Sequence, residues 1–319
     1  MYPPIIYLHY LLQQIYYMRI AVIGAGHIGT IHAKIYSKLN NVQLVAICDI
    51  DKSREQLAHE LKTTFTTNYK KLPTIDAVSI TTPTKQHHEI GLYFLKQNIP
   101  CLIEKPLTNT IKESEELCKY NNILQVGHIE RFNPAIRAAH QYVNNPWFIK
   151  TTRTSPYQNR STEISVILDL MIHDIDLITS ILGEPSDITA NGISIISTTE
   201  DIVNAHLKFP NGASANIMVS RISHQKERKM QIFQKDNYLS LDLLNGCGTY
   251  IKIEKNTKEL KQINLINDGI GSLDMELLNF IKNIQTNTKP IINGKTGLNA
   301  LRIAHKIISI ITENNHKQH

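Results

Sequence analysis

The sequence predicts an α/β fold, in which an N-terminal, doubly wound parallel sheet is followed by an α+β domain with an open, mainly antiparallel sheet. Three observations support this fold class. Apolar strand patterns alternate with helical patterns in the first part of the chain, as in a parallel sheet covered by helices. A glycine-rich turn follows the first strand pattern. After residue 128 the pattern changes to short alternating segments, and Pro210-Asn211-Gly212 is typical of a hairpin turn.

The first part contains five predicted strands, each followed by a helix or a glycine. The strands are short apolar runs bounded by turn residues, and the helices carry apolar residues at helical spacing. In such an arrangement, ligands bind at the carboxyl ends of the strands. Strands are expected at 19–23, 42–48, 76–81, 100–104 and 123–126, and helices at 27–39, 53–61, 85–97 and 111–120.

The second part begins with a helix near Asn133 and contains an apolar helix over 166–182 that ends at Gly183. We expect domains at 18–128 and 129–319. Residues 1–17 are expected to be an N-terminal extension, because Met18 directly precedes the first strand and is a natural start. Further strands are expected at 147–153, 188–196, 202–209, 213–220, 230–233, 238–243 and 249–253, with closing helices near 273–285 and 297–311.

The glycine-rich turn has the spacing of a dinucleotide-binding loop. Gly24 permits the tight turn, Gly26 lets the backbone approach a pyrophosphate, and Gly29 lets the helix pack closely on the strand. The helix begins with His27 and Ile28, where free N–H groups and the positive dipole end attract phosphates. With a strand before it and a helix after it, the motif predicts a Rossmann domain, although a glycine-rich turn without a ligand is the alternative.

An acidic residue ends the second predicted strand, twenty positions after the third glycine. Asp49 is placed there to accept hydrogen bonds from a ribose diol, and its carboxylate would repel the 2′-phosphate of NADP. Lys52 and Arg54 are near, but they fall on the following helix. The sequence therefore favours NAD over NADP as the cofactor.

The composition limits the classes of partner. Hydrophobic residues make up 42% and charged residues 19% of the chain, which are globular values. The net charge is +6, but the basic residues are scattered, so no nucleic-acid partner is expected. No apolar run reaches the length of a membrane span. The four cysteines lack C-x-x-C spacing, so we expect no metal site and a reducing, cytoplasmic location.

A lysine follows the fourth predicted strand, in the segment Glu104-Lys105-Pro106. Proline holds the preceding residue extended, which aims Lys105 at the cleft. A lysine in an apolar cleft can donate a strong hydrogen bond to a substrate oxygen. The alternative for this residue alone is a solvated lysine at a strand end.

An acid and a histidine share one face of the apolar helix over 166–182. Asp169 and His173 are four residues apart, and Asp176 lies one turn beyond. Burying such groups costs free energy unless they are paired or used. The pattern alone leaves open a structural pair and a catalytic one.

These motifs occur in the chain together with Thr82-Pro83, His87 and Gly127-His128. In this order they resemble the glucose–fructose oxidoreductase / inositol dehydrogenase / rhizopine-catabolism (GFO/IDH/MocA) superfamily. The resemblance implies a Rossmann domain followed by an open-faced sheet domain, which carries the substrate site and the contacts of a homo-oligomer, a dimer or a tetramer. Besides the glycine turn and Asp49, contacts to the cofactor are expected from Thr82, Pro83, His87, Glu104 and Lys105.

The resemblance also implies that three residues match the catalytic positions: Lys105, Asp169 and His173. His173 is then expected to take the proton of an alcohol as its hydride leaves. Lys105 is expected to stabilise the negative charge on the same oxygen, so no metal is needed. Asp169 is expected to steady the histidine or the substrate hydroxyl.

Residues 127–134 and 160–176 resemble the branch that contains UDP-N-acetylglucosamine 3-dehydrogenases. This implies NAD-dependent oxidation of a secondary hydroxyl on a nucleotide-linked amino sugar. Three arginines are candidates for its diphosphate, with a surface role as the alternative for each. Substrate contacts are expected from His128, Arg131, Asn133, Arg153, Arg160 and Asp176.

Two other functions remain open. One is oxidation or reduction of a free polyol or another small carbonyl compound, since the superfamily also includes inositol dehydrogenases and biliverdin reductases. The other is a non-catalytic NAD-binding regulator, which predicts the loss of catalytic residues. Because Lys105, Asp169 and His173 are all present, an enzyme is favoured over a regulator.

Overall fold

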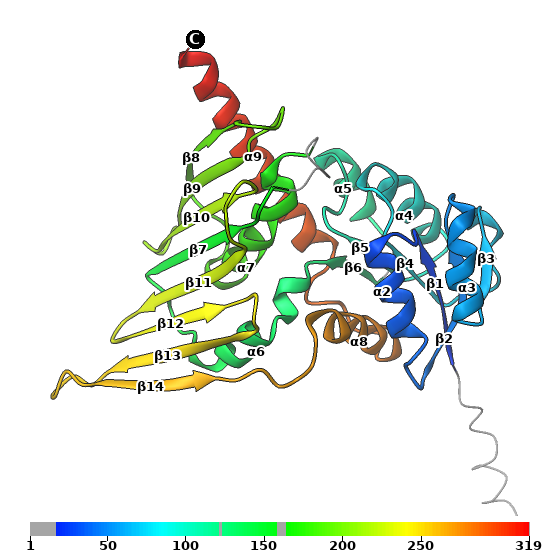
Figure 1. The fold of residues 1–319 in the computed structure, drawn as a ribbon, viewed down its shortest axis with the longest axis horizontal. Coiled ribbons are helices and arrows are strands. Elements are labelled where there is room, and N and C mark those ends of the chain that lie inside the picture. Colours follow the sequence, from blue (N-terminus) through cyan, green and yellow to red (C-terminus); the bar gives the residue numbers. More distant parts are fainter. Residues whose placement is uncertain (1–16, 121–122, 158–163, 319) are drawn as a thin grey trace, which may run out of the picture.

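The computed structural model describes residues 17–120, 123–157 and 164–318, and it consists of two sheets with helices between them (Figure 1). The first sheet is built from the N-terminal part of the chain and the second from the middle part. Two predictions lie outside the described residues. These are the extension over 1–17, of which only Tyr17 is described, and the role of Arg160.

The first sheet confirms the predicted parallel arrangement. It has six strands in the order β3-β2-β1-β4-β5-β6, and every neighbouring pair is parallel. Its interior strands are buried on both faces, which explains their continuous apolar runs. The sequence does not predict β3, because three residues at the sheet edge are too few to show a pattern. The strands are β1 (Met18–Ile23), β2 (Val42–Cys48), β3 (Thr64–Thr66), β4 (Ala77–Ile80), β5 (Cys101–Glu104) and β6 (Leu124–Gly127).

Helices cover both faces of the first sheet. One face packs against α2 (His27–Tyr36), α3 (Glu55–Glu60) and α8 (Ser272–Gln285). The other face packs against α4 (His87–Leu95) and α5 (Ile111–Leu117). α8 follows the second sheet in the sequence but packs in the core of the first sheet. The expected domain boundary at residue 128 stays a prediction.

The turn between β1 and α2 requires glycine at two positions. Gly24 has a φ of +91°, and a Cβ there would lie 2.7 Å from the backbone that follows β4. A Cβ on Gly29 would lie 1.8 Å from the carbonyl oxygen of Gly24. Both distances are shorter than a Cβ atom tolerates to a non-bonded atom, so the tight turn and the close helix need these glycines.

The second sheet has eight strands in the order β14-β13-β12-β11-β7-β10-β9-β8. Only the β7–β10 pair is parallel, so the predicted, mainly antiparallel sheet is confirmed. The predicted hairpin turn at Pro210-Asn211-Gly212 joins β9 to β10. The strands are β7 (Phe148–Thr154), β8 (Asp187–Ile193), β9 (Ile202–Lys208), β10 (Ser214–Ser220), β11 (Glu227–Gln234), β12 (Asn237–Asp242), β13 (Cys247–Ile253) and β14 (Leu260–Leu265).

Three helices cover one face of the second sheet: α6 (Pro134–Ala139), α7 (Ile172–Leu182) and α9 (Gly294–Gln318). The predicted helix over 166–182 begins with a π-helical turn, Ile167–Met171, before α7. α9 contacts α7 and β8 and also α5 and β6, so it ties the two sheets together (Figure 1). Among the described helices, none is both long and apolar enough to cross a membrane.

Candidate active site

The carboxyl ends of the central parallel strands border a cavity of about 490 Å³. Its lining includes Gly24 and Gly26 after β1, Asp49 after β2, and Thr82 and Pro83 after β4. At Gly26 no atom lies within 4 Å of where a Cβ would stand, so a side chain would fill the space that a phosphate needs. The lining fits the adenosine and phosphate part of a dinucleotide.

The N-terminus of α2 is available to an anion. The N-cap residue is Gly26, which has no side chain to cap the helix, and His27 and Ile28 are exposed. The N–H groups of a first helical turn have no partner within the helix and carry its positive dipole end. The predicted phosphate contacts therefore lie beside the cavity.

Asp49 also braces the glycine-rich turn. Its Oδ2 accepts a hydrogen bond from the Ala25 N–H at 2.5 Å, and its Oδ1 accepts one from the Asp51 N–H at 2.9 Å. Each carboxylate oxygen can accept more than one hydrogen bond. Asp49 can therefore hold the turn and still accept a bond from a ribose hydroxyl.

The residues after β4 differ in what they can contact. Thr82 and Pro83 line the cavity, and the Thr82 hydroxyl is buried with no partner in the part of the chain that the structure describes. His87 is only 1% exposed, and its ring nitrogens lie 2.9 Å from the Pro106 carbonyl oxygen and 2.7 Å from that of Thr82. The expectation that His87 contacts the cofactor is corrected, because both nitrogens are committed to these loops.

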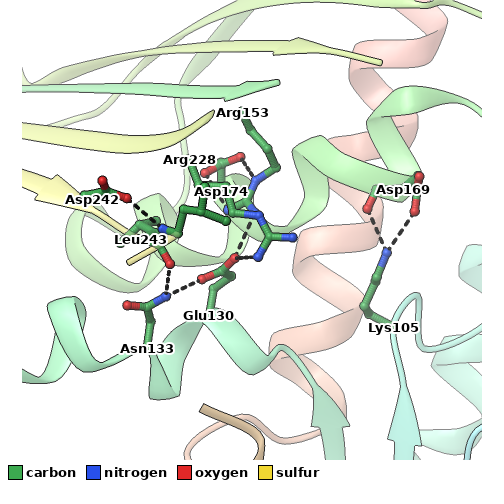
Figure 2. Close-up of polar contacts among 10 residues, drawn as sticks. Lys105, Glu130, Asn133, Arg153, Asp169, Asp174, Arg228, Asp242 and Leu243 are labelled. Carbon is green, nitrogen blue, oxygen red and sulfur yellow. Dashed lines mark hydrogen bonds and ion pairs between the residues drawn. The ribbon is translucent and has the colours of Figure 1, made fainter. Parts of the chain in front are cut away.

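Lys105 extends from the end of β5 towards the π-helical turn (Figure 2). Its Nζ donates to the Asp169 backbone carbonyl at 2.7 Å and lies 3.2 Å from Asp169 Oδ1. The Lys105 side chain is 19% exposed and that of Asp169 is 40% exposed. A half-buried ammonium held by two oxygens is well placed to donate to a third oxygen in the cleft.

His173 lies one turn after Asp169, at the start of α7. Its Nδ1 is buried and has no partner among the described residues. Burial lowers the pKa of His173 well below its usual value, and the positive charges of Lys105 and Arg153 lower it further. The imidazole is therefore neutral at neutral pH, which is the form that can accept a proton.

The structure refines the expected pairing of Asp169 with His173. Within the described residues no hydrogen bond joins them, and Asp169 faces Lys105 instead. A π-helical turn changes the side-chain spacing by about one residue for every turn. The sequence gives no signal for this turn, so four-residue spacing led to the wrong partner.

Two further predicted residues, His128 and Glu104, have little contact with solvent. His128 is 1% exposed, and neither ring nitrogen has a partner within the described chain. Burial lowers the pKa of His128; the charge of Asp176 opposes this effect, and the charges of Arg131 and Lys105 support it. Glu104 turns towards His32 of α2, 3.4 Å from its Nε2, rather than into the cavity.

Arg153 and Asn133 belong to a buried ionic network (Figure 2). Arg153 is 2% exposed and donates to Asp174 at 2.7 Å and to Glu130 at 2.8 Å. Asn133 donates to Glu130 at 2.9 Å, and Arg228 lies 3.3 Å from the same carboxylate. The expectation that Arg153 binds a diphosphate is corrected, because its guanidinium is enclosed by two carboxylates.

Arg131 and Asp176 form a second ion pair. Arg131 Nε and Nη2 donate to the two Asp176 oxygens at 2.6 and 3.0 Å, and Asp176 is 1% exposed. A buried bidentate pair of this kind is costly to break. Both side chains are therefore occupied, and the prediction that they bind substrate directly is not supported by their contacts.

Sequence reasoning missed Glu130, Asp174 and Arg228 as members of this region. Together with Arg153 they make a buried network of two arginines and two carboxylates. The signal for Asp174 is its place inside an apolar helix, where an acid needs a partner. For Arg228 no local signal exists, because strand pairing across β7 and β11 brings it to Arg153.

A parallel sheet with a glycine-rich turn and an acid at its cavity, together with a lysine at the end of β5 and a histidine on a helix of the second sheet, is typical of a two-domain NAD-binding dehydrogenase. The chain belongs to the GFO/IDH/MocA family of oxidoreductases. Residues 18–128 match the family described as "Oxidoreductase family, NAD-binding Rossmann fold", and residues 134–239 match the "GFO/IDH/MocA C-terminal domain". The resemblance drawn from the motifs is thereby confirmed.

Several relatives of this chain are named as dehydrogenases of sugars or polyols. The UDP-N-acetylglucosamine 3-dehydrogenase of Acidithiobacillus ferrooxidans is 37% identical over 72% of this chain and 75% of its own length. A solved structure of that enzyme covers 92% of this chain and 97% of its own, with a TM-score of 0.87. The myo-inositol 2-dehydrogenase of Thermotoga maritima is 26% identical over 90% of this chain and 94% of its own. The protein is a sugar oxidoreductase of this family.

Proposed function

We propose that the protein oxidises a secondary hydroxyl of a nucleotide-linked amino sugar, as a UDP-N-acetylglucosamine 3-dehydrogenase does. The observation that carries the chemistry is the Lys105 ammonium, held by Asp169 one turn before His173, whose pKa is lowered by burial and by the charge of Lys105. The similarity that supports the substrate is 37% identity to an enzyme with that name. NAD supplies the hydride acceptor when it is bound.

Each residue has one role in this reaction. Lys105 Nζ donates a hydrogen bond to the substrate oxygen and stabilises the charge that develops there. A ring nitrogen of His173 takes the hydroxyl proton, because the imidazole is neutral before the reaction. Asp169 holds Lys105 in place through its carbonyl and carboxylate oxygens, rather than acting on the histidine.

We propose NAD rather than NADP as the cofactor. Asp49 stands on the cavity wall, where its negative charge opposes a 2′-phosphate. Asp49→Asn keeps the shape of the side chain and removes its charge. We expect this variant to narrow the preference for NADH over NADPH about tenfold, measured by fluorescence titration of the two reduced cofactors. Equal affinities in the unmodified protein would overturn the proposed preference.

The substrate is tested by NADH formation with UDP-N-acetylglucosamine, free N-acetylglucosamine, glucose and myo-inositol. A carbonyl trap should be present, because alcohol oxidation can be unfavourable at equilibrium. We expect turnover with the UDP-sugar and much less with the free sugars. Activity with myo-inositol alone would favour the second candidate, a polyol dehydrogenase, for which the Thermotoga maritima relative is the supporting similarity.

A further inference from the structure

A cluster of three ionisable side chains lies behind the catalytic end of β5. His32 comes from α2, Glu104 from the last position of β5, and Glu276 from α8. One ligand atom from each lies within 4.8 Å of the others. Glu276 and His32 are 0% exposed, and both carboxyl oxygens of Glu276 lack a hydrogen-bond partner among the described residues. The proposed reaction does not use this cluster.

Contacts with its neighbours fix the geometry of the cluster. His32 Nδ1 is hydrogen-bonded to Ser79 Oγ at 2.7 Å, so its Nε2 faces Glu104 Oε1 at 3.4 Å. The backbone N–H of Lys105 donates to Glu104 Oε2 at 3.2 Å. A Cβ on Gly127 would lie 2.8 Å from the Glu104 carboxylate, so the glycine provides the space for it. Glu104 thus links the cluster directly to the backbone of Lys105.

Glu276 is fully buried and the Glu104 side chain is 17% exposed, so two carboxyl groups this close cannot both carry a charge without a large free-energy cost. Burial alone would raise the pKa of Glu104, but the contact with His32 and the charge of Lys105 hold that pKa below its usual value. Burial and the charge of Glu104 raise the pKa of Glu276 well above its usual value. Opposite shifts of this kind assign the negative charge to Glu104 and the proton to Glu276.

We propose that Glu276 is a positioning residue, which as a neutral carboxylic acid donates a hydrogen bond to the Glu104 carboxylate and so holds the backbone of Lys105 at the end of β5. Its effect on turnover rests on the proposed role of Lys105. The cluster also includes His32 of α2, whose N-terminus lies beside the cofactor cavity. Glu276 would thereby keep the cofactor helix and the catalytic strand in register.

The other titratable groups near Glu276 agree with this protonation. On α2 they are His32 and Tyr36; burial raises the pKa of Tyr36, so its hydroxyl stays neutral. On β5 the group is Glu104. The charged residues of the segment Ile129–Phe132, which also packs on α8, are turned to other partners, Glu130 to Arg153 and Arg131 to Asp176. No described cation reaches Glu276 that would keep it ionised.

The first test is stability against pH, which needs no substrate. Because the folded protein holds Glu276 protonated while the unfolded chain releases the proton above pH ~4.3, the contribution of Glu276 to the free energy of unfolding falls as pH rises from that value. Glu276→Gln keeps a neutral donor and does not titrate. We expect Tm of Glu276→Gln minus Tm of wild type to increase from pH 5 to pH 8, by about 2–4 °C or more. Asp274→Asn, an exposed acid on the same helix, is the control.

The second test uses the pair Glu276→Gln and Glu276→Met, which are similar in size, although only Gln can donate. In the Met variant Glu104 loses a donor, so its pKa rises and the acid limb of the kcat/KM profile moves to higher pH. In Glu276→Met we expect kcat to fall about tenfold and KM for NAD to change less than twofold. In Glu276→Gln we expect kcat and the pH profile to match those of the wild type. A purely structural role would lower Tm without moving the profile.

The outcomes separate the alternatives. If Gln destabilises the protein at pH 8 as much as Met does, Glu276 is ionised and the proposal is wrong. If the purified protein carries a stoichiometric metal that Glu276→Gln loses, these side chains bind an ion instead. If no assayed sugar reacts, the proposed function fails, but the stability test still decides the protonation of Glu276. Should the Met variant not fold, the comparison of Gln with wild type remains decisive.

Discussion

At the scale of single residues, the site depends on placing a cation next to an uncharged base. Lys105 lowers the pKa of His173, in addition to the larger effect of burial. The lysine therefore favours the unprotonated base and can also stabilise an alkoxide. Asp169 is 40% exposed and accepts from Lys105 through two oxygens, so it orients the ammonium without enclosing it.

This arrangement predicts separate effects on chemistry and on cofactor binding. We expect Lys105→Met and His173→Asn each to lower kcat by about 10²–10³-fold, because each removes an interaction that strengthens in the transition state. The Kd for NADH should change less than threefold, since neither residue lines the dinucleotide cavity. Stopped-flow kinetics with the active substrate and NADH titration would measure the two effects.

Lys105→Arg is the matched control, because it keeps the charge but not the compact ammonium. It should recover only part of the lost turnover. If either Lys105→Met or His173→Asn kept near-normal kcat, that residue would be removed from the mechanism. A parallel loss of NADH affinity would instead show a folding defect in the cofactor domain.

At the scale of elements, the sequence predicts those parts that carry a periodic pattern. The buried strands could be placed because they are continuous apolar runs, and the glycine-rich turn because its glycines have a fixed spacing. β3 and β14 could not, since β3 has three residues and β14 is exposed at five of its six positions. The π-helical turn has no periodic signal either. Because of this turn, Asp169 contacts Lys105 and not His173, the partner that the helical spacing predicts.

The ionic network shows a second limit of sequence reasoning. Three arginines were natural candidates for a diphosphate, but a sequence does not reveal which cations already have buried partners. Arg153 meets Glu130 and Asp174 only after β7, α7 and the segment after β6 have packed together. The sequence alone therefore does not show that Arg131 and Arg153 have buried acidic partners, because these partners are distant in sequence.

At the scale of the whole molecule, the C-terminal helices return to the first sheet. α8 packs on the face that also holds α2, and α9 contacts elements of both sheets. Lys105 comes from the first sheet, and its partner Asp169 comes from the segment that leads into α7. The relative position of the two sheets thus decides whether Lys105 and His173 meet, and the stability of the whole fold bears on activity.

That stability should depend on pH through buried histidines. Burial lowers the pKa values of His87, His128 and His173, although two carbonyl contacts oppose the effect at His87. The unfolded chain therefore binds more protons than the folded protein as pH falls below ~6.5, and the free energy of unfolding decreases. The loss is at most about 2 kcal/mol for each histidine at pH 5. Glu276 acts in the opposite direction, so single variants are needed to separate the contributions.

His128 gives the clearest case, because neither of its ring nitrogens has a partner among the described residues. His128→Phe removes the titrating group and leaves no donor or acceptor unsatisfied. We expect its Tm to fall less than that of wild type between pH 7 and pH 5, measured by calorimetry over that range. His59→Phe, at an exposed position of α3, controls for the loss of a surface histidine. An unchanged slope in His128→Phe would mean that the pKa of His128 is the same in the folded protein as in the unfolded chain, which would contradict the lowering by burial.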